Sequence, residues 1–313
     1  MSAVSVFAPA SIGNFIVGFD CLGAAIQPLD RSLLGDVVRI EDSAHDQVTV
    51  TGAYASALPT DPRDNIVFAC RERFNELLRQ RDCVASPNHI VLDKRLPIGS
   101  GLGSSATSVV ACLAALNEWY GKPMAEFELL RLCGELEGRI SGGLHYDNVA
   151  PSLRGGLQLM VPDNERVSIG LPIPDWILVM CYPGIKVETK AARAVLPKQY
   201  ALGDCVHFAE RLAAFVAAMM ARDFNFALQL LHDDLIEPHR APLVPGFQLA
   251  KIAALHAGAA AFGLSGSGPS CLAICTNITV AEQVKTAVVG AFPPQETLFA
   301  TLTKIAPQGA HLL

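Results

Sequence analysis

Apolar residues recur along the chain at strand or helix spacing, and stretches rich in glycine, proline or polar residues separate the segments. In the first half, alternating or mainly apolar runs predict strands of an antiparallel sheet at 4–8, 36–40, 47–52 and 90–92. Apolar positions at helical spacing predict helices at 66–79, 104–120 and 125–139. This mixed order indicates an α+β fold rather than a doubly wound one.

The second half of the chain shows the same mixture. Strands are predicted at 155–161 and 176–182, a short helix after Thr189, and longer helices at 207–222, 224–235 and 250–261. A proline-containing junction at 162–174 is the expected boundary between two domains. We place the domains at 1–165 and 166–313.

Composition narrows the kind of protein. The 313 residues are 51% apolar and 17% charged, which suffices for two well-packed domains. The net charge of −6 argues against nucleic acid or an anionic membrane as the main partner. Nine cysteines lack paired metal-ligand spacing, which favours reduced core residues. With no signal-peptide pattern and no apolar run of ~18 residues, we expect a cytoplasmic protein without a membrane span.

The most distinctive stretch, Pro97 to Thr107, reads P-I-G-S-G-L-G-S-S-A-T and leads into a predicted helix. Three glycines allow close approach, and the N–H groups of a helix start lack intrahelical acceptors, so the stretch favours an oxyanion. Ser104 and Ser105 are placed to cap the helix and to contact a metal-bound phosphate. The spacing fits neither a Walker A loop nor the dinucleotide fingerprint, and an ordinary tight loop with a serine cap is the open alternative.

Two further glycine-containing loops carry polar residues. The loop at 8–23 holds Asn14 and Asp20. Asp20 lies among apolar residues, where it either caps a turn or binds a cationic or hydroxylic substrate. The turn at 263–269, G-L-S-G-S-G-P, is a weaker candidate for a ligand loop.

Other candidates for binding are a polar cluster and two arginines. His145, Asp147 and Asn148 lie close together in one loop, which is more hydrogen-bonding capacity than a turn requires. Arg193 follows Thr189 in a short predicted helix, and Arg240 lies in a segment between prolines. Isolated arginines are usually solvated, so these two are weaker signals.

Three of these stretches, at 8–23, 97–107 and 263–269, resemble in order the motifs of the GHMP kinases, the small-molecule kinases for galactose, homoserine, mevalonate and phosphomevalonate. Five strings along nearly the whole chain are similar to the homoserine kinases: V-G-F-D-C-L-G, P-I-G-S-G-L-G-S-S-A, G-E-L-E-G-R-I-S-G-G-L-H-Y-D-N-V-A-P, Y-P-G-I-K-V-E-T-K-A-A-R-A-V-L-P and L-S-G-S-G-P. The resemblance implies a two-domain GHMP kinase fold, with the glycine-rich phosphate loop in an N-terminal α+β domain and a ferredoxin-like α+β C-terminal domain.

The resemblance also implies the cofactors ATP and Mg²⁺. It places Asn65 near the adenine and the triphosphate on a loop made of Pro97, Ile98, Gly99, Ser100, Gly101, Leu102, Gly103, Ser104, Ser105, Ala106 and Thr107. It assigns the metal to Glu137 together with Ser104 or Ser105, in keeping with the few protein oxygens that Mg²⁺ takes. Glu135 and Glu137 lie on different faces of their helix, so at most one is expected inside.

For a homoserine kinase the resemblance implies L-homoserine as the substrate. Asn14 and Asp20 would bind its ammonium, and Arg193 and Arg240 its carboxylate as a fork. Asn148 would bind the hydroxyl that attacks phosphorus. The catalytic residues implied in this way are Asn148, Glu137 and Ser105.

The chain departs from the family at one motif and leaves several questions open. It has A-S-I-G-N where homoserine kinases usually have A-S-S-A-N, so Ile12 and Phe15 make the substrate less certain than the kinase chemistry. No general base is evident, and Asp147 is a candidate stand-in. Positioning and charge stabilisation are therefore expected to carry phosphoryl transfer.

Two alternatives to a homoserine kinase are another GHMP kinase, for a different hydroxy amino acid or a mevalonate-type substrate, and a non-catalytic ligand sensor. The intact phosphate loop and Glu137 disfavour the sensor. The resemblance also suggests a homodimer, and it leaves inhibition by threonine undetermined.

Overall fold

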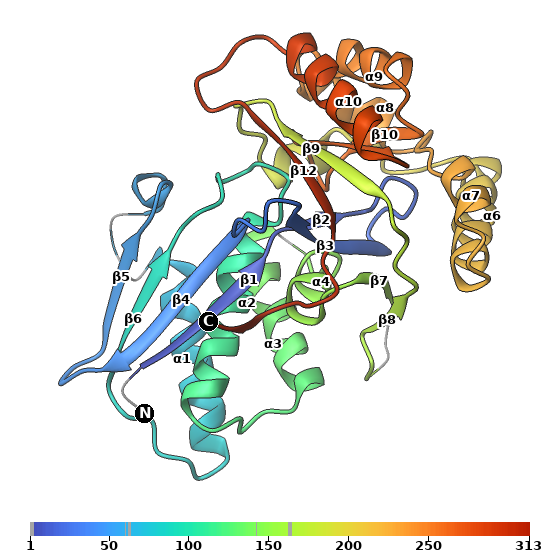
Figure 1. Ribbon diagram of the computed structural model, residues 1–313. Coiled ribbons are helices and arrows are strands. Elements are labelled where there is room, and N and C mark those ends of the chain that lie inside the picture. The colour runs from blue at the N-terminus through green and yellow to red at the C-terminus, as the bar shows by residue number, and fades with distance from the viewer. Residues whose placement is uncertain (1–2, 60, 62–63, 142, 162–164) are drawn as a thin grey trace.

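The computed structural model describes residues 3–59, 61, 64–141, 143–161 and 165–313, and the strands of this part of the chain lie in two sheets (Figure 1). Helices accompany both sheets, and the order of elements mixes helices and strands. The predicted α+β fold is confirmed.

The first sheet has the strand order β13-β1-β4-β6-β5. Its strands are β1 (Ala3–Pro9), β4 (Gly35–Asp42), β5 (Gln47–Thr51), β6 (Asn88–Asp93) and β13 (His311–Leu312). All neighbours pair antiparallel except β5, which pairs parallel with β6. The antiparallel prediction is therefore wrong for β5. A parallel neighbour needs a crossover, and here the chain returns through the 3₁₀ turn η1 (Ala55–Ala57) and helix α1 (Ile66–Gln80).

Helix α2 (Ser104–Trp119) is the central helix of this half, and it packs on β1 and β4. It also contacts α1, α3 (Glu126–Ser141) and α4 (Val149–Arg154). Because α2 is apolar around most of its circumference, it is enclosed by the sheet on one side and by helices on the other. Its buried side chains, such as Val109, Leu113 and Leu116, belong to the core of this half.

The second sheet has the order β10-β11-β9-β12-β3-β7-β8, with β2 also paired to β3. Its strands are β2 (Ser11–Gly13), β3 (Leu22–Pro28), β7 (Leu157–Met160), β8 (Ser168–Leu171), β9 (Ile177–Tyr182), β10 (Ala261–Leu264), β11 (Cys271–Cys275) and β12 (Phe299–Ile305). The helices of this half are α5 (Thr189–Ala194), α6 (Leu202–Met220), α7 (Phe224–Gln229), α8 (Glu237–Arg240), the 3₁₀ turn η3 (Ala241–Leu243), α9 (Phe247–His256) and α10 (Ile278–Ala291). Helices α9 and α10 pack on each other, and α10 packs against β9 (Figure 1).

Strands from both ends of the chain contribute to each sheet. β3, from the first thirty residues, pairs with β12 and β7, and β13 at the C-terminus pairs with β1. The two halves therefore share hydrogen-bonded strands across the predicted junction. The domain limits 1–165 and 166–313 stay a prediction.

Three local predictions differ from the structure. The loop at 8–23 contains β2 and leads into β3, because the two pair with each other despite Pro9 and the glycines. The helix predicted at 224–235 ends at Gln229, since the Asp233 carboxylate accepts the N–H groups that open α8. The helix predicted at 250–261 ends at His256, just before Gly258 with its φ of +100°.

The described residues contain no helix that is both long enough and apolar enough to cross a membrane.

Candidate active site

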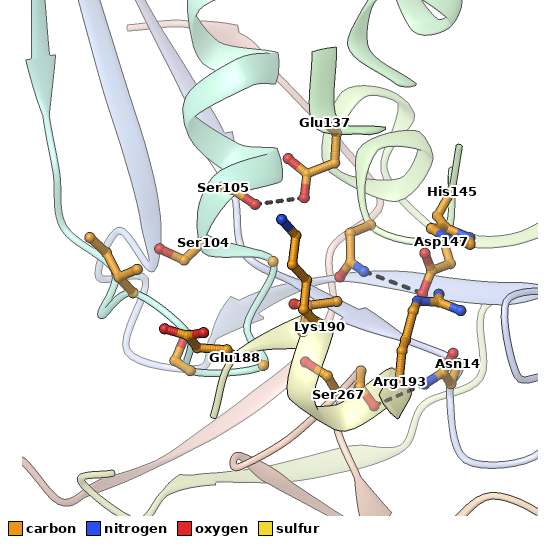
Figure 2. A pocket seen from close by; sticks show the side chains of 18 of the residues that line it. Asn14, Ser104, Ser105, Glu137, His145, Asp147, Glu188, Lys190, Arg193 and Ser267 are labelled. Atoms are coloured by element: carbon orange, nitrogen blue, oxygen red, sulfur yellow. Dashed lines mark hydrogen bonds between the residues drawn. The ribbon is translucent and has the colours of Figure 1, made fainter. Parts of the chain in front are cut away.

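A cavity of about 370 Å³ lies where the loops of the two halves meet (Figure 2). It is lined by the N-terminal loop, the glycine-rich loop, α3, the polar loop before α4, the segment 186–193, Arg240 and the turn at 266–267. A volume of this size suits a small-molecule ligand. Most of the sequence-predicted site residues line it: Asn14, Asp20, Ile98, Gly99, Ser100, Gly101, Gly103, Ser104, Ser105, Glu137, Asn148, Arg193 and Arg240.

The glycine-rich loop depends on its glycines for its shape. Gly99, Gly101 and Gly103 have φ values of +65°, +78° and +66°, in the left-handed region that favours glycine. A Cβ on Gly103 would lie 2.1 Å from Ser11 Oγ, and a Cβ on Gly101 would lie 2.5 Å from a backbone oxygen. The loop therefore combines an unusual backbone with close packing.

No side chain among the described residues caps the start of α2, contrary to the prediction of a serine cap. Gly103 is the N-cap residue. The Ser104 hydroxyl donates to Leu96 O at 3.2 Å, and the Ser105 hydroxyl donates to Glu137 Oε1 at 2.6 Å. Because side chains leave the first N–H groups of the helix unbonded, this end of α2 can receive an anion.

The carbonyl groups of the loop are held by donors of the surrounding elements. Three backbone N–H groups donate to the loop: Val187 to Gly99 O at 3.0 Å, Ser270 to Ser100 O at 3.0 Å and Ser11 to Leu102 O at 3.1 Å. The Ser265 hydroxyl donates to Gly101 O at 2.6 Å. Among the described residues, the N–H groups of Gly99, Gly101 and Gly103 have no acceptor. N–H groups without an acceptor in a loop of this kind are available to an anion.

Glu137 and Ser105 form the part of the cavity that fits a metal ion. Burial raises the pKa of Glu137 to about 7, against the lowering effect of the Ser105 hydrogen bond. The described residues contain no group of three or more His, Cys, Asp or Glu side chains with metal-binding geometry. A single carboxylate beside a hydroxyl at the phosphate loop is instead the donor set that Mg²⁺ takes together with phosphate oxygens. Ser105 rather than Ser104 lies beside Glu137.

At the other end of the cavity, Asp20 and Arg193 form a two-pronged ion pair. Arg193 donates through Nη1 and Nη2 to the two oxygens of Asp20, at 3.1 and 2.7 Å. Both side chains remain about 30% exposed. Arg240, 3% exposed, donates to Ala192 O and Gly266 O. The guanidinium groups of Arg193 and Arg240 both lie over the ring of Phe19, at 5.6 and 5.0 Å from its centre.

Asn14 is fixed by the backbone around it. Its amide donates to Gly266 O at 2.9 Å, and its Oδ1 accepts the N–H of Asp20 at 3.0 Å. Asn14 and Asp20 have φ values of +67° and +56°. Asn and Asp adopt this left-handed region more readily than other non-glycine residues, and the two hydrogen bonds of Asn14 hold the loop in this conformation.

The polar loop before α4 brings an amide and a carboxyl group between the two ends of the cavity. Ser11 Oγ donates to Asn148 Oδ1 at 2.9 Å, and Asn148 Nδ2 donates to Asp147 Oδ2 at 3.2 Å. Burial, and to a lesser extent the charge of Asp20, raises the pKa of Asp147 to about 7. His145 Nδ1 lies 3.6 Å from Asp20 Oδ2, and burial lowers the pKa of His145.

Several predicted residues lie outside the cavity. Asn65 caps α1 by accepting the Val67 N–H at 3.0 Å. Thr107 donates its hydroxyl to the buried carboxylate of Asp36 at 2.8 Å. Pro97, Leu102 and Ala106 do not line the cavity either. Ile12 and Phe15, the departures from the homoserine kinase motif, are fully buried in the core beneath it.

Sequence reasoning missed Lys186, Glu188, Lys190 and Ser267, which also line the cavity. Figure 2 shows Lys190 reaching from α5 into the cavity. Its spacing of three residues from Arg193 places both on one side of a helical turn, which was a usable signal.

Comparison with known proteins gives consistent matches. The family model of the GHMP kinases N terminal domain matches residues 65–156, and that of the GHMP kinases C terminal matches residues 212–294. The chain is 34% identical to a homoserine kinase from Cytophaga hutchinsonii, with a TM-score of 0.89 over 100% of this chain and 98% of the other.

Two further structures share the fold at low identity. A putative homoserine kinase from Listeria monocytogenes is 20% identical, with a TM-score of 0.71 over 99% of both chains. A galactokinase from Lactococcus lactis in complex with galactose is 15% identical, with a TM-score of 0.67 over 99% of this chain and 95% of the other.

Proposed function

Because the chain belongs to the GHMP kinase family, we propose that it transfers the γ-phosphoryl group of ATP to the side-chain hydroxyl of L-homoserine. The hydroxyl oxygen forms the new bond to phosphorus and loses its proton, and the bond to the β-phosphate oxygen breaks. The products are ADP and O-phospho-L-homoserine, a precursor of threonine. The full-length likeness to a homoserine kinase at 34% identity supports this proposal.

The observation that carries the proposal is the pairing of two unlike subsites in one cavity. One end offers backbone N–H groups and a helix start, which suit phosphates. The other end offers Asp20, Arg193 and Arg240. A zwitterionic amino acid can bind between Asp20 and Arg193, because its ammonium and carboxylate replace one ion pair by two. A neutral sugar has no ammonium or carboxylate group and cannot form ion pairs with Asp20, Arg193 or Arg240.

Asn148 lies where it can orient the substrate hydroxyl, because Ser11 and Asp147 fix its amide. Asp147 carries a pKa of about 7, so it can hold or accept a proton near neutral pH. We do not assign it as an indispensable base, since phosphoryl transfer through a loose transition state depends chiefly on positioning and on stabilising charge.

The residues that would hold Mg²⁺ are Glu137 and Ser105. When bound, the ion neutralises charge on the phosphates. The protein itself would present the N–H groups of the loop to the phosphates and hold Glu137 beside the loop. Lys190 points toward Ser105 and Glu137 in the same cavity (Figure 2), where it would bind the phosphates.

The deciding experiment measures ADP release from Mg·ATP with L-homoserine, D-homoserine, L-serine, L-threonine, mevalonate and galactose. We expect strong selectivity for L-homoserine. Turnover with mevalonate or galactose would retain the kinase and overturn the substrate. ATP binding without turnover of any compound would favour the ligand sensor.

A further inference from the structure

Two charged side chains lie fully buried beneath the glycine-rich loop. Lys94 is 1% exposed and Asp36 0% exposed. Lys94 Nζ donates to Asp36 Oδ2 at 2.5 Å. Burial lowers the pKa of Lys94, and the charge of Asp36 opposes that shift. A buried ion pair is often no more stabilising than a well-packed apolar pair, so its position in the fold is the more informative feature.

Asp36 holds the entrance to the loop. Its Oδ1 accepts the N–H groups of Arg95 and Leu96, at 2.9 and 3.3 Å. These are the two residues that precede Pro97, where the chain leaves β6 and enters the loop. The carboxylate is thereby fixed to the first side of the loop.

Lys94 holds the exit of the loop, at the first turn of α2. Its Nζ donates to Ser104 O at 2.6 Å and to Ser108 Oγ at 3.0 Å. Asp36 Oδ2 also accepts the hydroxyls of Thr107 and Ser108, at 2.8 and 2.7 Å. Apart from its bond to Lys94, each hydrogen bond of this carboxylate goes to one end of the loop or the other.

We propose that the Asp36–Lys94 pair is a positioning device that closes the base of the phosphate loop and thereby sets nucleotide affinity. Leu96 and Ser104 are the ends that it brings together, and Ser104 Oγ donates directly to Leu96 O at 3.2 Å. Neither charged residue lines the cavity, so both act through the loop backbone. The inference rests on the proposed function only in assigning the loop to a nucleotide.

The test is the dissociation constant of Mg·ADP, measured by isothermal titration calorimetry with the full chain. In Lys94→Met, Asp36 keeps four donors, namely the N–H groups of Arg95 and Leu96 and the hydroxyls of Thr107 and Ser108. We therefore expect a folded protein. The variant loses the hydrogen bonds from Lys94 to Ser104 and Ser108 that hold the two ends of the loop together. Mg·ADP binding should therefore weaken by about tenfold or more, while L-homoserine binding should change by less than about threefold.

The matched control is Asn117→Ala, on the same helix. Asn117 is buried and exchanges hydrogen bonds with the backbone of Met124 at 3.1 and 3.0 Å, away from the loop. The Asn117→Ala variant should have a lower free energy of unfolding than the wild type, but its Mg·ADP affinity should stay within about threefold of the wild-type value. This separates a change in the loop from general destabilisation.

A double variant, Asp36→Asn with Lys94→Met, removes the pair without leaving a lone buried charge. We expect its Mg·ADP binding to stay weak. Wild-type affinity in the double variant, or in a folded Lys94→Met, would overturn the proposal. If the wild type binds Mg·ADP but does not phosphorylate L-homoserine, and Lys94→Met weakens that binding, the proposed substrate fails and the loop closure stands.

Discussion

Asp147 shows how strongly the cavity acts on a single carboxyl group. It is 6% exposed, and burial raises its pKa from 3.8 to about 7. The folded chain therefore binds a proton that the unfolded chain has already released at pH 5. This contribution to stability is complete below about pH 3.8 and is lost as the pH rises through about 7.

We expect Asp147→Asn to remove this pH dependence. Between pH 5 and 8, the free energy of unfolding of the wild type should fall relative to that of the variant by about 3 kcal/mol, since about two pH units at 1.36 kcal/mol each separate pH 5 from the raised pKa. Urea unfolding at both pH values measures it. Asp175→Asn, at an exposed aspartate outside the cavity, is the matched control. Parallel curves for wild type and Asp147→Asn would contradict the raised pKa.

The same variant tests the absence of an indispensable base. We expect Asp147→Asn to lower turnover by less than about a thousandfold, because positioning and charge stabilisation remain. His145→Gln should behave likewise. Steady-state kinetics with L-homoserine gives kcat and KM separately. A larger loss in kcat with unchanged substrate binding would make the side chain a general base after all.

Arg193 tests the amino-acid subsite. Arg193→Lys keeps the charge but loses the two-pronged contact with Asp20, so KM for L-homoserine should rise by about tenfold or more while KM for ATP changes little. Arg211→Lys, in an exposed ion pair with Asp234 outside this cavity, is the matched control. Equal effects on both KM values would show that Arg193 does not act on the amino acid alone.

At the scale of elements, the turn between β10 and β11 ties the two ends of the cavity together. Its Ser265 hydroxyl donates to Gly101 O in the phosphate loop. Its Gly266 O accepts from both Asn14 and Arg240. The turn at 263–269 therefore belongs to the site, although on its own it was the weaker candidate among the glycine-containing loops.

The glycines at the two ends of α2 offer a matched pair for testing the phosphate loop. Gly103 and Gly121 have φ values of +66° and +77°, but only Gly103 is crowded, since nothing lies within 4 Å of a Cβ on Gly121. Gly103→Ala should therefore weaken Mg·ADP binding by about tenfold or more, while Gly121→Ala should cost about 1 kcal/mol of stability and leave binding unchanged. Calorimetry and urea unfolding measure the two effects. Unchanged binding in Gly103→Ala would show that the loop shape does not depend on this glycine.

At the scale of the whole molecule, β3 and β13 connect the ends of the chain. β3 lies between β12 and β7, so the second sheet has strands from both sides of residue 165. Separating the chain there removes β3 from the side of β12 and β8 from the side of β7. Unpaired strand edges of this kind favour aggregation.

We therefore expect the fragments 1–165 and 166–313 not to fold separately, and the intact chain to unfold in one cooperative transition. Circular dichroism of each fragment and of an equimolar mixture tests this, with the intact chain as reference. A fragment 166–313 that alone gives a sharp thermal transition would show that the predicted domain is independent.

The sequence by itself predicted the glycine-rich loop and the helix that follows it. The spacing of Gly99, Gly101 and Gly103 before an apolar helix is a local signal, because backbone conformation and helix starts depend on neighbouring residues. The α+β class likewise followed from periodicity, which each segment carries within itself. The ranges of most helices and strands were close for the same reason.

Only the tertiary structure decided which distant groups meet. Asp20 and Arg193 are 173 residues apart in the chain and form one ion pair. Lys94 forms a buried ion pair with Asp36, although a lysine that follows a strand is normally expected to be exposed. The parallel pairing of β5 and the place of β3 between β12 and β7 are also long-range choices. Burial raises the pKa of Glu137 and of Asp147 to about 7. No single segment carries this effect, because desolvation depends on every element packed around the group.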